Sequence, residues 1–402
     1  MIERKIYIDK ILKFKDLPIA KAIVGLRRTG KSNIILQYID FLKTNFKISD
    51  SHILYLDFED MENENLLDSS SLYKFLSSKI KSTDKKYYIF LDEVQKVNKF
   101  EDIVSTFYKK KNVDLYITGS NSYLLDNNRP TLLTGRTITI FIFPLSFKEF
   151  YNFYNDKNKS LQFVFENYLK FGGMPFTTLL NLQSSEINKY ISSIDSDILV
   201  KDISQFLLQK NINVNDILLL NIKKYIYTQC GNFTSINNIR NNLKQINISI
   251  YNDLLESIVE GFCNSFQLFK VNRYDLLGNS ILKTDYKYYV NDHSFRNIFL
   301  SNYKENYGFL LENIVYFELL RRDYEVYIGK NNRSEIDFVA IKNGEKTYIQ
   351  VTKEINSNNF DREIKNLTSA KGATKKILLS LQEEEKIIDS VYCKNLARWL
   401  LE

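Results

Sequence analysis

Residues 20–32 read AKAIVGLRRTGKS, a largely apolar run followed by a segment, Gly25 to Ser32, that matches GxxxxGK[ST] at every fixed position. The apolar run predicts a buried strand, and the residues from Ser32 to Phe46 have the pattern of a helix. A strand, this loop and a helix in that order are the context in which the motif binds phosphate groups. The stretch therefore predicts an α/β domain with a phosphate-binding loop after its first strand.

The residue types of this loop explain its chemistry. Gly25 and Gly30 allow a tight turn, so that main-chain N–H groups and the amino end of the helix point at phosphate oxygens. Lys31 is expected to reach the β- and γ-phosphates of ATP, and the Ser32 hydroxyl is expected to bind Mg²⁺. The predicted nucleotide-binding residues of the loop and helix start are Gly25, Leu26, Arg27, Arg28, Thr29, Gly30, Lys31, Ser32 and Asn33. The two arginines fit either a phosphate contact or a domain interface.

A second motif, IFLDEV at residues 89–94, is an apolar strand that ends in two acids. Open α/β sheets bind ligands at the carboxyl ends of their strands. Asp92 is therefore expected to hold Mg²⁺, largely through water, and Glu93 to polarise the attacking water. This pair of acids favours hydrolysis of the nucleotide over binding alone.

Two later segments supply further candidates. LYITGSNS, residues 115–122, predicts a strand end at which Ser120 or Asn121 senses the γ-phosphate, although an ordinary turn fits as well. Arg136, in TLLTGRTI, fits an arginine finger that acts on the nucleotide of its own chain or of a neighbouring subunit. A structural salt bridge is the competing interpretation for this arginine.

Four more apolar runs predict strands at residues 53–58, 87–91, 114–118 and 137–143. Helical patterns separate these runs, as is typical of a parallel sheet covered on both faces.

Composition limits the class of protein. The 402 residues carry a net charge of +7, which permits contact with phosphate groups without requiring it. Three distant cysteines and two histidines leave no transition-metal cluster to build. No apolar run reaches the roughly 18 residues of a membrane span. We therefore expect a cytoplasmic protein with no membrane partner.

The motifs GLRRTGKS, IFLDEVQKV, ITGSNSYLL, GRTITIFIFPLSFKEF, FGGMPF and DILVKDI occur in this order. The set resembles the prokaryotic, archaeal-type AAA-family P-loop ATPases that carry a C-terminal domain of unknown function with a nuclease-like fold. The resemblance implies four parts: an AAA-type ATPase core at residues 1–150, a helical lid at 151–208, a winged-helix-like module at 209–293, and a small restriction-endonuclease-like α/β domain at 294–402.

The sequence pattern of the middle of the chain is compatible with two kinds of binding partner. Helical patterns at residues 217–229, 236–243 and 250–262 precede a pair of strand-like segments, as in a winged helix. In a DNA-binding module of this kind, the helix that begins near Ser249 would enter the major groove. That helix carries three acidic residues and no Lys or Arg, and acidic side chains repel phosphates. Contact with double-stranded DNA and contact with a protein therefore both remain open.

The last part contains EIDFVA at residues 335–340 and YIQVTK at residues 348–353. These segments resemble the PD-(D/E)xK nucleases, in which two acids bind Mg²⁺ and a lysine activates water. Asp337 matches the first acid, but Gln350 and Thr352 occupy the positions of the second acid and the lysine. Lys353 is expected on the opposite face of its strand. The domain is therefore expected to have lost cleavage.

Together these patterns predict an ATP hydrolase that uses ATP and Mg²⁺ and couples its nucleotide state to the C-terminal domains, on DNA or otherwise. One alternative is a regulatory ATPase that acts as a switch on a protein partner or in a homo-oligomer. Another is a DNA-cutting effector that uses Glu312, Glu335 and Asp337.

Overall fold

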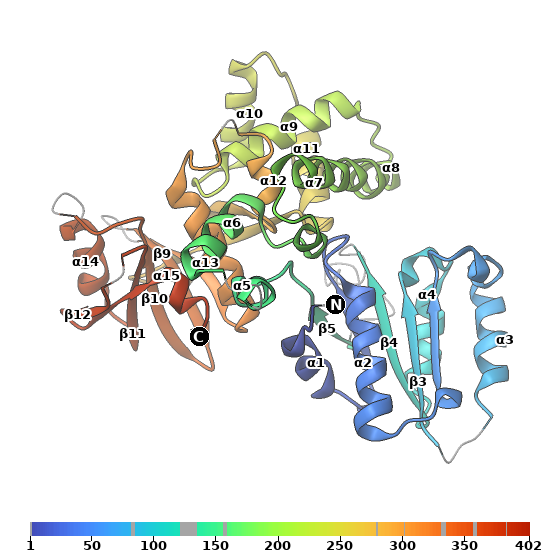
Figure 1. Ribbon diagram of the computed structural model, residues 1–402. Helices are drawn as coiled ribbons and strands as arrows, with labels where there is room; N and C mark the ends of the chain where they lie inside the picture. Colours follow the sequence, from blue (N-terminus) through green and yellow to red (C-terminus); the bar gives the residue numbers. More distant parts are fainter. Residues whose placement is uncertain are drawn as a thin grey trace. The chain divides into compact units, whose positions relative to one another are not determined.

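The computed structural model describes residues 2–81, 85–120, 135–155, 159–278, 280–300, 302–330, 335–356, 360–382 and 384–402 (Figure 1). The chain forms two compact units. The N-terminal unit comprises Met1–Ile142 with Asn264–Phe266, and the C-terminal unit comprises Phe143–Cys263 with Gln267–Glu402.

The N-terminal unit contains a five-stranded sheet in the order β2-β3-β4-β1-β5, in which all neighbouring strands are parallel. Its strands are β1 (Ala20–Val24), β2 (Ile53–Asp57), β3 (Tyr87–Asp92), β4 (Val113–Gly119) and β5 (Thr137–Phe141). Its helices are α1 (Lys5–Leu12), α2 (Lys31–Phe46), α3 (Ser69–Lys79) and α4 (Phe100–Phe107), with short 3₁₀ turns at η1 (Asp50–His52), η2 (Met61–Leu66) and η3 (Val94–Lys96). The prediction of a parallel α/β sheet is confirmed, and each predicted strand lies within two residues of its observed bounds.

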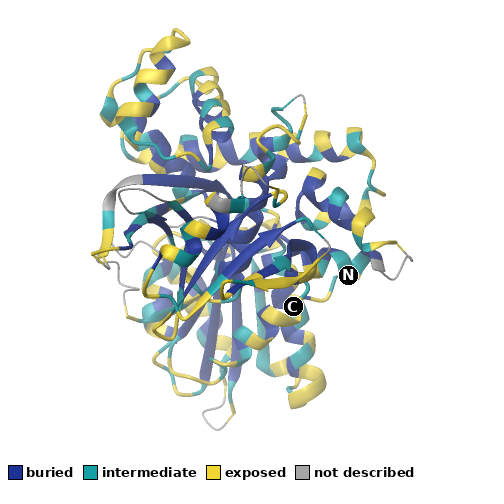
Figure 2. Ribbon diagram, turned by 90° about the vertical axis from the view of Figure 1, so that its left-hand side faces the viewer, coloured by how far each residue is buried: buried dark blue, intermediate teal, exposed yellow. Residues whose placement is uncertain are grey.

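Burial explains why the central strands are continuous apolar runs. Every residue of β1, β3 and β4 is buried, whereas the outer strands β2 and β5 are mostly half-buried. Figure 2 shows strands coloured as buried and helices with exposed residues along one side. A parallel sheet needs such cover on both faces, because its crossover helices pack against both sides.

The C-terminal unit combines helices with an eight-stranded mixed sheet in the order β12-β13-β11-β10-β9-β8-β6-β7. Its strands are β6 (Leu268–Asp275), β7 (Ser280–Val290), β8 (Glu325–Lys330), β9 (Glu335–Lys342), β10 (Glu345–Val351), β11 (Lys375–Ser380), β12 (Lys386–Ile388) and β13 (Val391–Asn395). Its helices are α5 (Phe147–Asn155), α6 (Leu161–Phe171), α7 (Ser184–Ile198), α8 (Ser204–Gln209), α9 (Asp216–Gln229), α10 (Ile236–Gln245), α11 (Asn252–Asn264), α12 (Ser294–Asn297), α13 (Tyr307–Arg321), α14 (Phe360–Ser369) and α15 (Leu396–Trp399). A 3₁₀ turn, η5 (Pro175–Leu179), follows α6, and a π-helical turn, η6 (Leu199–Ile203), joins α7 to α8 within the DILVKDI motif.

The hairpin β6–β7 belongs to the same sheet as the strands of the last hundred residues. Its two strands pair antiparallel, and β6 also pairs with β8 in parallel. The strands β8, β9 and β10 are consecutive and antiparallel, and after α14 the chain adds β11 parallel to β10. The three helices α9, α10 and α11 and the hairpin that follows them therefore share one compact unit with residues 294–402.

Two of the segments that carry the family resemblance have structural roles. In PLSFKEF, the Ser146 hydroxyl accepts from the Glu149 N–H (3.1 Å) and the Glu149 carboxylate accepts from the Ser146 N–H (2.8 Å), which is a capping box at the start of α5. In FGGMPF, the Gly173 N–H donates to Asp292 Oδ2 at 2.7 Å. A Cβ on Gly172, whose φ is +74°, would lie 2.0 Å from Asp292 Oδ1. Glycine is therefore required for this close approach.

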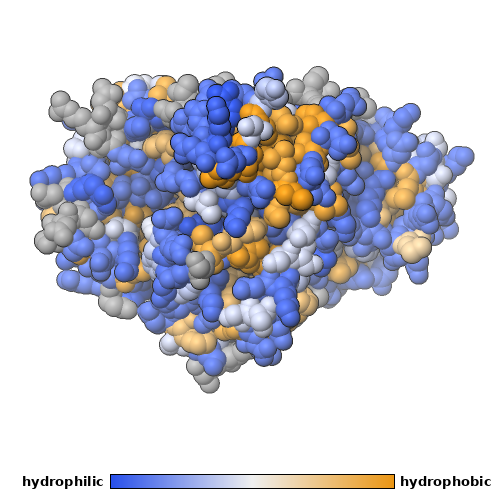
Figure 3. Space-filling view, turned by 90° about the horizontal axis from the view of Figure 1, so that it is seen from above, coloured by the Kyte–Doolittle hydropathy of each residue, from blue (hydrophilic) through white to orange (hydrophobic). Residues whose placement is uncertain are grey.

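The surface of the C-terminal unit exposes several large apolar side chains. Val200, Leu208 and Ile217 are 52%, 57% and 69% exposed and belong to the consecutive elements η6, α8 and α9. Figure 3 shows apolar side chains gathered among hydrophilic ones on the face that is seen from above. Among the described residues, the longest apolar helical stretch falls short of what a bilayer crossing needs.

Candidate functional site: the phosphate loop and its acids

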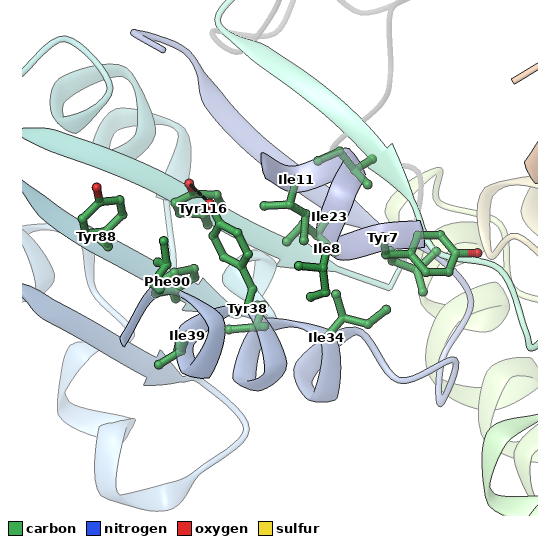
Figure 4. Close-up of a cluster of buried hydrophobic side chains, with 14 residues drawn as sticks. Tyr7, Ile8, Ile11, Ile23, Ile34, Tyr38, Ile39, Tyr88, Phe90 and Tyr116 are labelled. Atoms are coloured by element: carbon green, nitrogen blue, oxygen red, sulfur yellow. Dashed lines mark hydrogen bonds between the residues drawn. The ribbon is translucent and has the colours of Figure 1, made fainter. Parts of the chain in front are cut away.

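A cluster of buried apolar side chains fixes the helix that follows the loop. Ile34 and Tyr38 of α2 pack with Ile8 of α1 and with Phe90 and Tyr116 of the sheet (Figure 4). The Tyr38 and Tyr116 hydroxyls also share a hydrogen bond of 3.1 Å. Because this packing holds α2 against the centre of the sheet, the amino end of α2 is held at the carboxyl end of β1.

The loop between β1 and α2 is shaped by close main-chain contacts. A Cβ on Gly25 would lie only 2.2 Å from the Ile142 carbonyl oxygen, so no larger residue fits there. Gly30 has φ +92° and ψ +27°, a left-handed conformation, and it is the N-cap of α2. The Thr29 hydroxyl donates to the Leu26 carbonyl at 2.9 Å, and the Arg4 guanidinium donates to the Thr29 carbonyl at 3.0 Å. These contacts stabilise the tight turn that the glycine spacing predicts.

Lys31 begins α2 and its side chain turns back over the loop. Its ammonium donates to the carbonyls of Gly25 (3.2 Å) and Leu26 (3.4 Å) and lies 3.4 Å from Glu93 Oε1. The residue is buried. A cation is therefore held directly over the main chain that the motif assigns to phosphate binding.

Asp92 ends β3 and is oriented by two hydroxyl groups. The Thr118 hydroxyl donates to Asp92 Oδ1, and the Tyr55 hydroxyl donates to Asp92 Oδ2 at 2.9 Å. Thr118 comes from β4 and Tyr55 from β2, the two strands that flank β3. Both carboxylate oxygens are thereby held at the carboxyl edge of the sheet.

Glu93 follows directly and has an unusual backbone. Its φ of +52° and ψ of +48° are left-handed, and its N–H donates to the Thr118 hydroxyl at 2.8 Å. Gln95 donates to Glu93 Oε2 at 2.5 Å. Burial opposes ionisation of this carboxyl, but Lys31, Gln95 and Arg27 outweigh it and lower the pKa of Glu93. Glu93 is therefore a buried carboxylate that stays charged, as a water-polarising base must be.

Strand order brings these groups together. Because β4 lies between β1 and β3, the end of β4 stands between the loop and the two acids. Ser120, directly after β4, is fully buried, and its hydroxyl has no hydrogen-bond partner of normal geometry among the described residues. Its position beside Glu93 lowers the pKa of that carboxyl, as the last of several causes. Ser120 is thus placed where a γ-phosphate sensor is predicted, while Asn121 lies outside the described residues.

Four further predicted residues of the loop and the start of α2 are half-buried or exposed. Ser32 is half-buried and Asn33 is exposed at the start of α2. The Arg27 guanidinium lies 3.7 Å from Glu59 Oε1, and Arg28 is exposed with φ +63°.

Arg136 is not brought to the loop of its own chain. Its carbonyl oxygen accepts from the Ala20 N–H at 3.0 Å, so it lies at the amino ends of β1 and β5. The loop leaves the carboxyl end of β1, and five strand residues separate the two ends by about 15 Å. This is more than an arginine side chain spans. The expectation that Arg136 acts on the nucleotide of its own chain is therefore not supported by its position, and action on another subunit stays a prediction.

Four residues of this site were not predicted from the sequence: Tyr55, Asp57, Gln95 and Thr118. Tyr55 and Thr118 orient Asp92, and Gln95 holds Glu93. Asp57 lies opposite Asp92 in the pairing of β2 with β3. Burial is the main cause that raises the pKa of Asp57, and the negative charge of the nearby acids raises it further. A polar residue inside the buried strand LYITG was a signal for Thr118, since an unpaired hydroxyl is costly in a core.

The donor set fits a magnesium ion. The Ser32 hydroxyl and the Asp92 carboxylate are oxygen ligands, which Mg²⁺ prefers, and a protein usually supplies only one or two ligands beside phosphates and water. Among the described residues, no three His, Cys, Asp or Glu side chains are spaced to hold a metal ion by themselves. A metal at this site would therefore be held jointly by Ser32, Asp92 and a nucleotide.

A parallel sheet with a GxxxxGK[ST] loop after one strand and an Asp-Glu pair after a nearby strand defines an AAA-type P-loop nucleotide-binding domain. Residues 18–151 match the profile of the AAA domain, and residues 162–306 match a domain of unknown function, DUF8612. An uncharacterized protein of Haemophilus influenzae is 34% identical over 405 residues, which cover 100% of this chain and 99% of that protein. Uncharacterized protein MJ1544 of Methanocaldococcus jannaschii is 30% identical over 377 residues, which cover 89% of this chain and 80% of that protein.

The chain belongs to the family of these two proteins, in which it carries an AAA domain followed by DUF8612. Among solved structures, the Walker-type ATPase PABY2304 of Pyrococcus abyssi is similar, with a TM-score of 0.49 and 14% identity over 74% of this chain and 96% of that chain.

Proposed function

We propose that this protein is a magnesium-dependent ATP hydrolase. One observation carries the proposal: Lys31, Asp92 and the buried, charged Glu93 converge at the carboxyl edge of the parallel sheet. The Lys31 ammonium lies 3.4 Å from Glu93 Oε1. A site that only bound nucleotide would have no need of a second buried carboxylate beside the lysine. The AAA domain match supports the nucleotide-binding part of the proposal.

Each residue then has a defined task. The loop amides and the amino end of α2 bind the phosphates, and Lys31 exchanges Glu93 for β- and γ-phosphate oxygens. Ser32 and Asp92 would hold Mg²⁺, which neutralises developing charge when bound. Glu93, released from Lys31, accepts a hydrogen bond from the attacking water and aligns it. Ser120 donates to the γ-phosphate.

The direct test is the turnover of radiolabelled ATP by the full chain, measured against protein concentration and Mg²⁺ concentration. Turnover that requires Mg²⁺ and is lost on Glu93→Gln supports the proposal. Binding of ATP without turnover under any of these conditions would contradict hydrolysis and leave a nucleotide-controlled switch.

We further propose that nucleotide state is coupled to the C-terminal modules: a helical lid at 151–208, a winged-helix-like module at 209–293 and a nuclease-like domain at 294–402. The three helices before the hairpin β6–β7 support the second module. The order α13-β8-β9-β10-α14-β11, with antiparallel strands followed by one parallel pair, supports the third.

Double-stranded DNA and a protein remain the two candidate partners. Helix α11 carries Asp253, Glu256 and Glu260 and no Lys or Arg, which opposes a phosphate contact there. Val200, Leu208 and Ile217 of the same unit are exposed, and an apolar partner surface could cover them. Adding duplex DNA to the turnover assay separates the two, because stimulation by DNA supports the first and indifference supports the second.

For the nuclease-like domain we propose a scaffold without cleavage. Asp337 is buried, and its neighbour across the strand pair is the neutral Gln350, whose side-chain Oε1 accepts from the Asp337 N–H at 3.3 Å. Thr352 donates to the Glu354 carbonyl, and Lys353 is exposed. Incubation of the protein with DNA and Mg²⁺ or Mn²⁺ tests this, and metal-dependent cutting that Asp337→Ala removes would overturn it.

A further inference from the structure

A buried arginine from the chain segment before β1 contacts the phosphate loop from outside the motif. Arg4 is the N-cap residue of α1, and only 4% of it is exposed. Its Nη1 donates to the Thr29 carbonyl at 3.0 Å, in a buried hydrogen bond between residues that are 25 positions apart in the chain. Arginine is seldom buried without partners. The contact therefore belongs to the interior of the N-terminal unit, where a hydrogen bond from a charged group is stronger than on the surface.

The main chain and the side chain of Arg4 are both held by neighbouring residues. Its N–H donates to Gln37 Oε1 on α2 at 3.1 Å, and its carbonyl accepts from the Tyr7 N–H at 3.0 Å. The Gln37 amide also donates to the Ile2 carbonyl at 2.9 Å. The guanidinium carbon lies 4.5 Å from the centre of the Tyr7 ring, a cation–π contact, and Tyr7 is buried in the cluster that holds α2 (Figure 4). The donor to Thr29 is thus held in place from α1 and α2.

The Arg4 hydrogen bond fixes the direction of a loop amide. The Thr29 carbonyl and the Gly30 N–H belong to one planar peptide group, and in a trans peptide they point in opposite directions. Because the carbonyl points at Arg4, the Gly30 N–H points away from it. Gly30 is the N-cap of α2, and the first N–H groups of a helix have no partner within the helix. This N–H is therefore one of the main-chain donors that the loop can offer to an anion.

Gly30 by itself holds this peptide group weakly. Glycine adopts left- and right-handed conformations about equally readily, and Gly30 has φ +92°. Rotation of the peptide group between Thr29 and Gly30 would turn a carbonyl oxygen, which carries negative partial charge, toward the phosphates in place of an N–H. It would also take this acceptor from the buried guanidinium of Arg4, which is costly. Arg4 thus opposes the loop conformation that would repel a nucleotide.

We propose that Arg4 is a positioning residue for the phosphate loop, which holds the Thr29 carbonyl so that the Gly30 N–H faces the phosphates of a bound nucleotide. Because the amides of such a loop cradle the α- and β-phosphates, Arg4 should contribute equally to the binding of ADP and of ATP. The inference rests on the nucleotide-binding part of the proposed function and is independent of hydrolysis by Glu93.

The test is calorimetric titration of the full chain with ADP and with ATP in the presence of Mg²⁺. Arg4→Met keeps an unbranched side chain but has no donor, and its dissociation constants for ADP and ATP should both rise by at least about tenfold. Arg4→Lys keeps a cationic donor and should recover part of this loss. Lys5→Met is the matched control, because it removes the same charge from the adjacent, exposed residue and should leave both constants unchanged.

Two readouts separate positioning from a merely structural role. Calorimetric stoichiometry counts the folded fraction, whereas the dissociation constant describes the site in the chains that are folded. A structural role would lower the stoichiometry and the Tm of Arg4→Met and leave its dissociation constant for ADP as in the wild type. In steady-state turnover, positioning predicts that the rise in KM for ATP exceeds the fall in kcat, since the loop amides bind the substrate as well as the transition state.

Gln37→Leu covers the case in which Arg4→Met does not fold. It leaves Arg4 and the loop intact but releases the main chain of residues 2 and 4, and it should raise the dissociation constant for ADP about two- to fivefold. The inference is overturned if folded Arg4→Met binds ADP as the wild type does, or if Lys5→Met loses as much affinity as Arg4→Met. Where Arg4→Met does not fold, wild-type affinity in Gln37→Leu overturns it. A wild-type chain that binds no ADP would contradict the proposed function as well.

Discussion

The ammonium of Lys31 lies 3.4 Å from Oε1 of Glu93, so the cation predicted to bind the γ-phosphate and the carboxylate predicted to activate water are paired with each other. Binding of a triphosphate has to replace this pair, because one ammonium cannot keep both partners at full strength. Release of Glu93 toward water is then a consequence of phosphate binding to Lys31. The pair links occupancy of the loop to readiness for hydrolysis.

Lys31→Ala should remove ATP binding. The variant loses the ammonium that lies over the phosphate-binding main chain. Loss of its two expected charge-assisted hydrogen bonds to phosphate oxygens corresponds to a loss of affinity of at least about 100-fold. Calorimetric titration with ATP and Mg²⁺ measures it. Lys43→Ala is the matched control, because Lys43 is in the last turn of the same helix and pairs with the exposed Asp50. Equal ATP affinity in Lys31→Ala and Lys43→Ala would show that the loop does not bind the phosphates of ATP.

Glu93→Gln should separate binding from turnover. Loss of the carboxylate should lower the rate of hydrolysis by about 10²- to 10⁴-fold, as expected when a general base is removed. Lys31 no longer has to leave a charged partner, so ATP affinity should rise by roughly two- to fivefold. The exposed Glu64, in η2, provides the control variant Glu64→Gln. Unchanged turnover would dismiss Glu93 as the base, and a fall in ATP affinity would contradict the competition at Lys31.

Thr118→Val should weaken both the fold and the site. Valine has nearly the same shape, but it leaves the Glu93 N–H and Asp92 Oδ1 without their buried partner. Each unpaired buried group costs about 1–3 kcal/mol, so the free energy of unfolding of the N-terminal unit should fall by roughly 2–5 kcal/mol. Denaturant unfolding checks this, with Thr106→Val, whose hydroxyl bonds an exposed carbonyl on α4, as the control. Equal unfolding midpoints for the two variants would show that the Thr118 bridge is unimportant.

If Arg136 acts on the nucleotide of another subunit, two inactive variants should complement each other. Arg136→Ala keeps Glu93, and Glu93→Gln keeps Arg136. Mixed assemblies would then contain sites with both groups. We expect the mixture to hydrolyse ATP faster than either variant alone, with the gain rising with protein concentration. No gain at concentrations at which the wild type is fully active would assign Arg136 a structural role at the amino ends of β1 and β5.

His293 should make the C-terminal unit sensitive to mild acid. Its Nε2–H donates to the Tyr168 carbonyl at 2.7 Å, and burial lowers the pKa of His293, aided by Arg296 and Arg321 and opposed by Asp292. The unfolded chain therefore binds a proton near pH 6.5 that the folded chain does not bind. The free energy of unfolding should fall as the pH is lowered from about 6.5 toward 5.

Only two histidines are present, so this contribution can be isolated. In His293→Gln the amide can still donate to Tyr168, and the fall in stability between pH 6.5 and 5 should be smaller than in the wild type. His52→Gln, in η1, should keep the wild-type slope. Urea unfolding at several pH values measures both. The same slope in wild type and His293→Gln would rule out His293 as the cause.

The GxxxxGK[ST] loop, the strand that ends in Asp92 and Glu93, and the parallel α/β class of the N-terminal unit can all be predicted from the amino-acid sequence. These features are local: a loop of eight consecutive residues, a strand that ends in two acids, and apolar runs that a covered sheet requires. Each can be recognised without knowing which strands are neighbours.

The residues that complete each site from distant parts of the chain are visible only in the folded structure. Thr118 and Tyr55 are 26 and 37 residues from Asp92 in the chain, and only the order β2-β3-β4-β1 brings their hydroxyls to its carboxylate. The same holds for Arg4, which reaches the Thr29 carbonyl from the start of α1, and for Arg136, which lies at the far end of β1 from the loop. Periodicity encodes which face of an element is buried, but not which element lies beside it. Hydrogen bonds and ion pairs between strands depend on that second property.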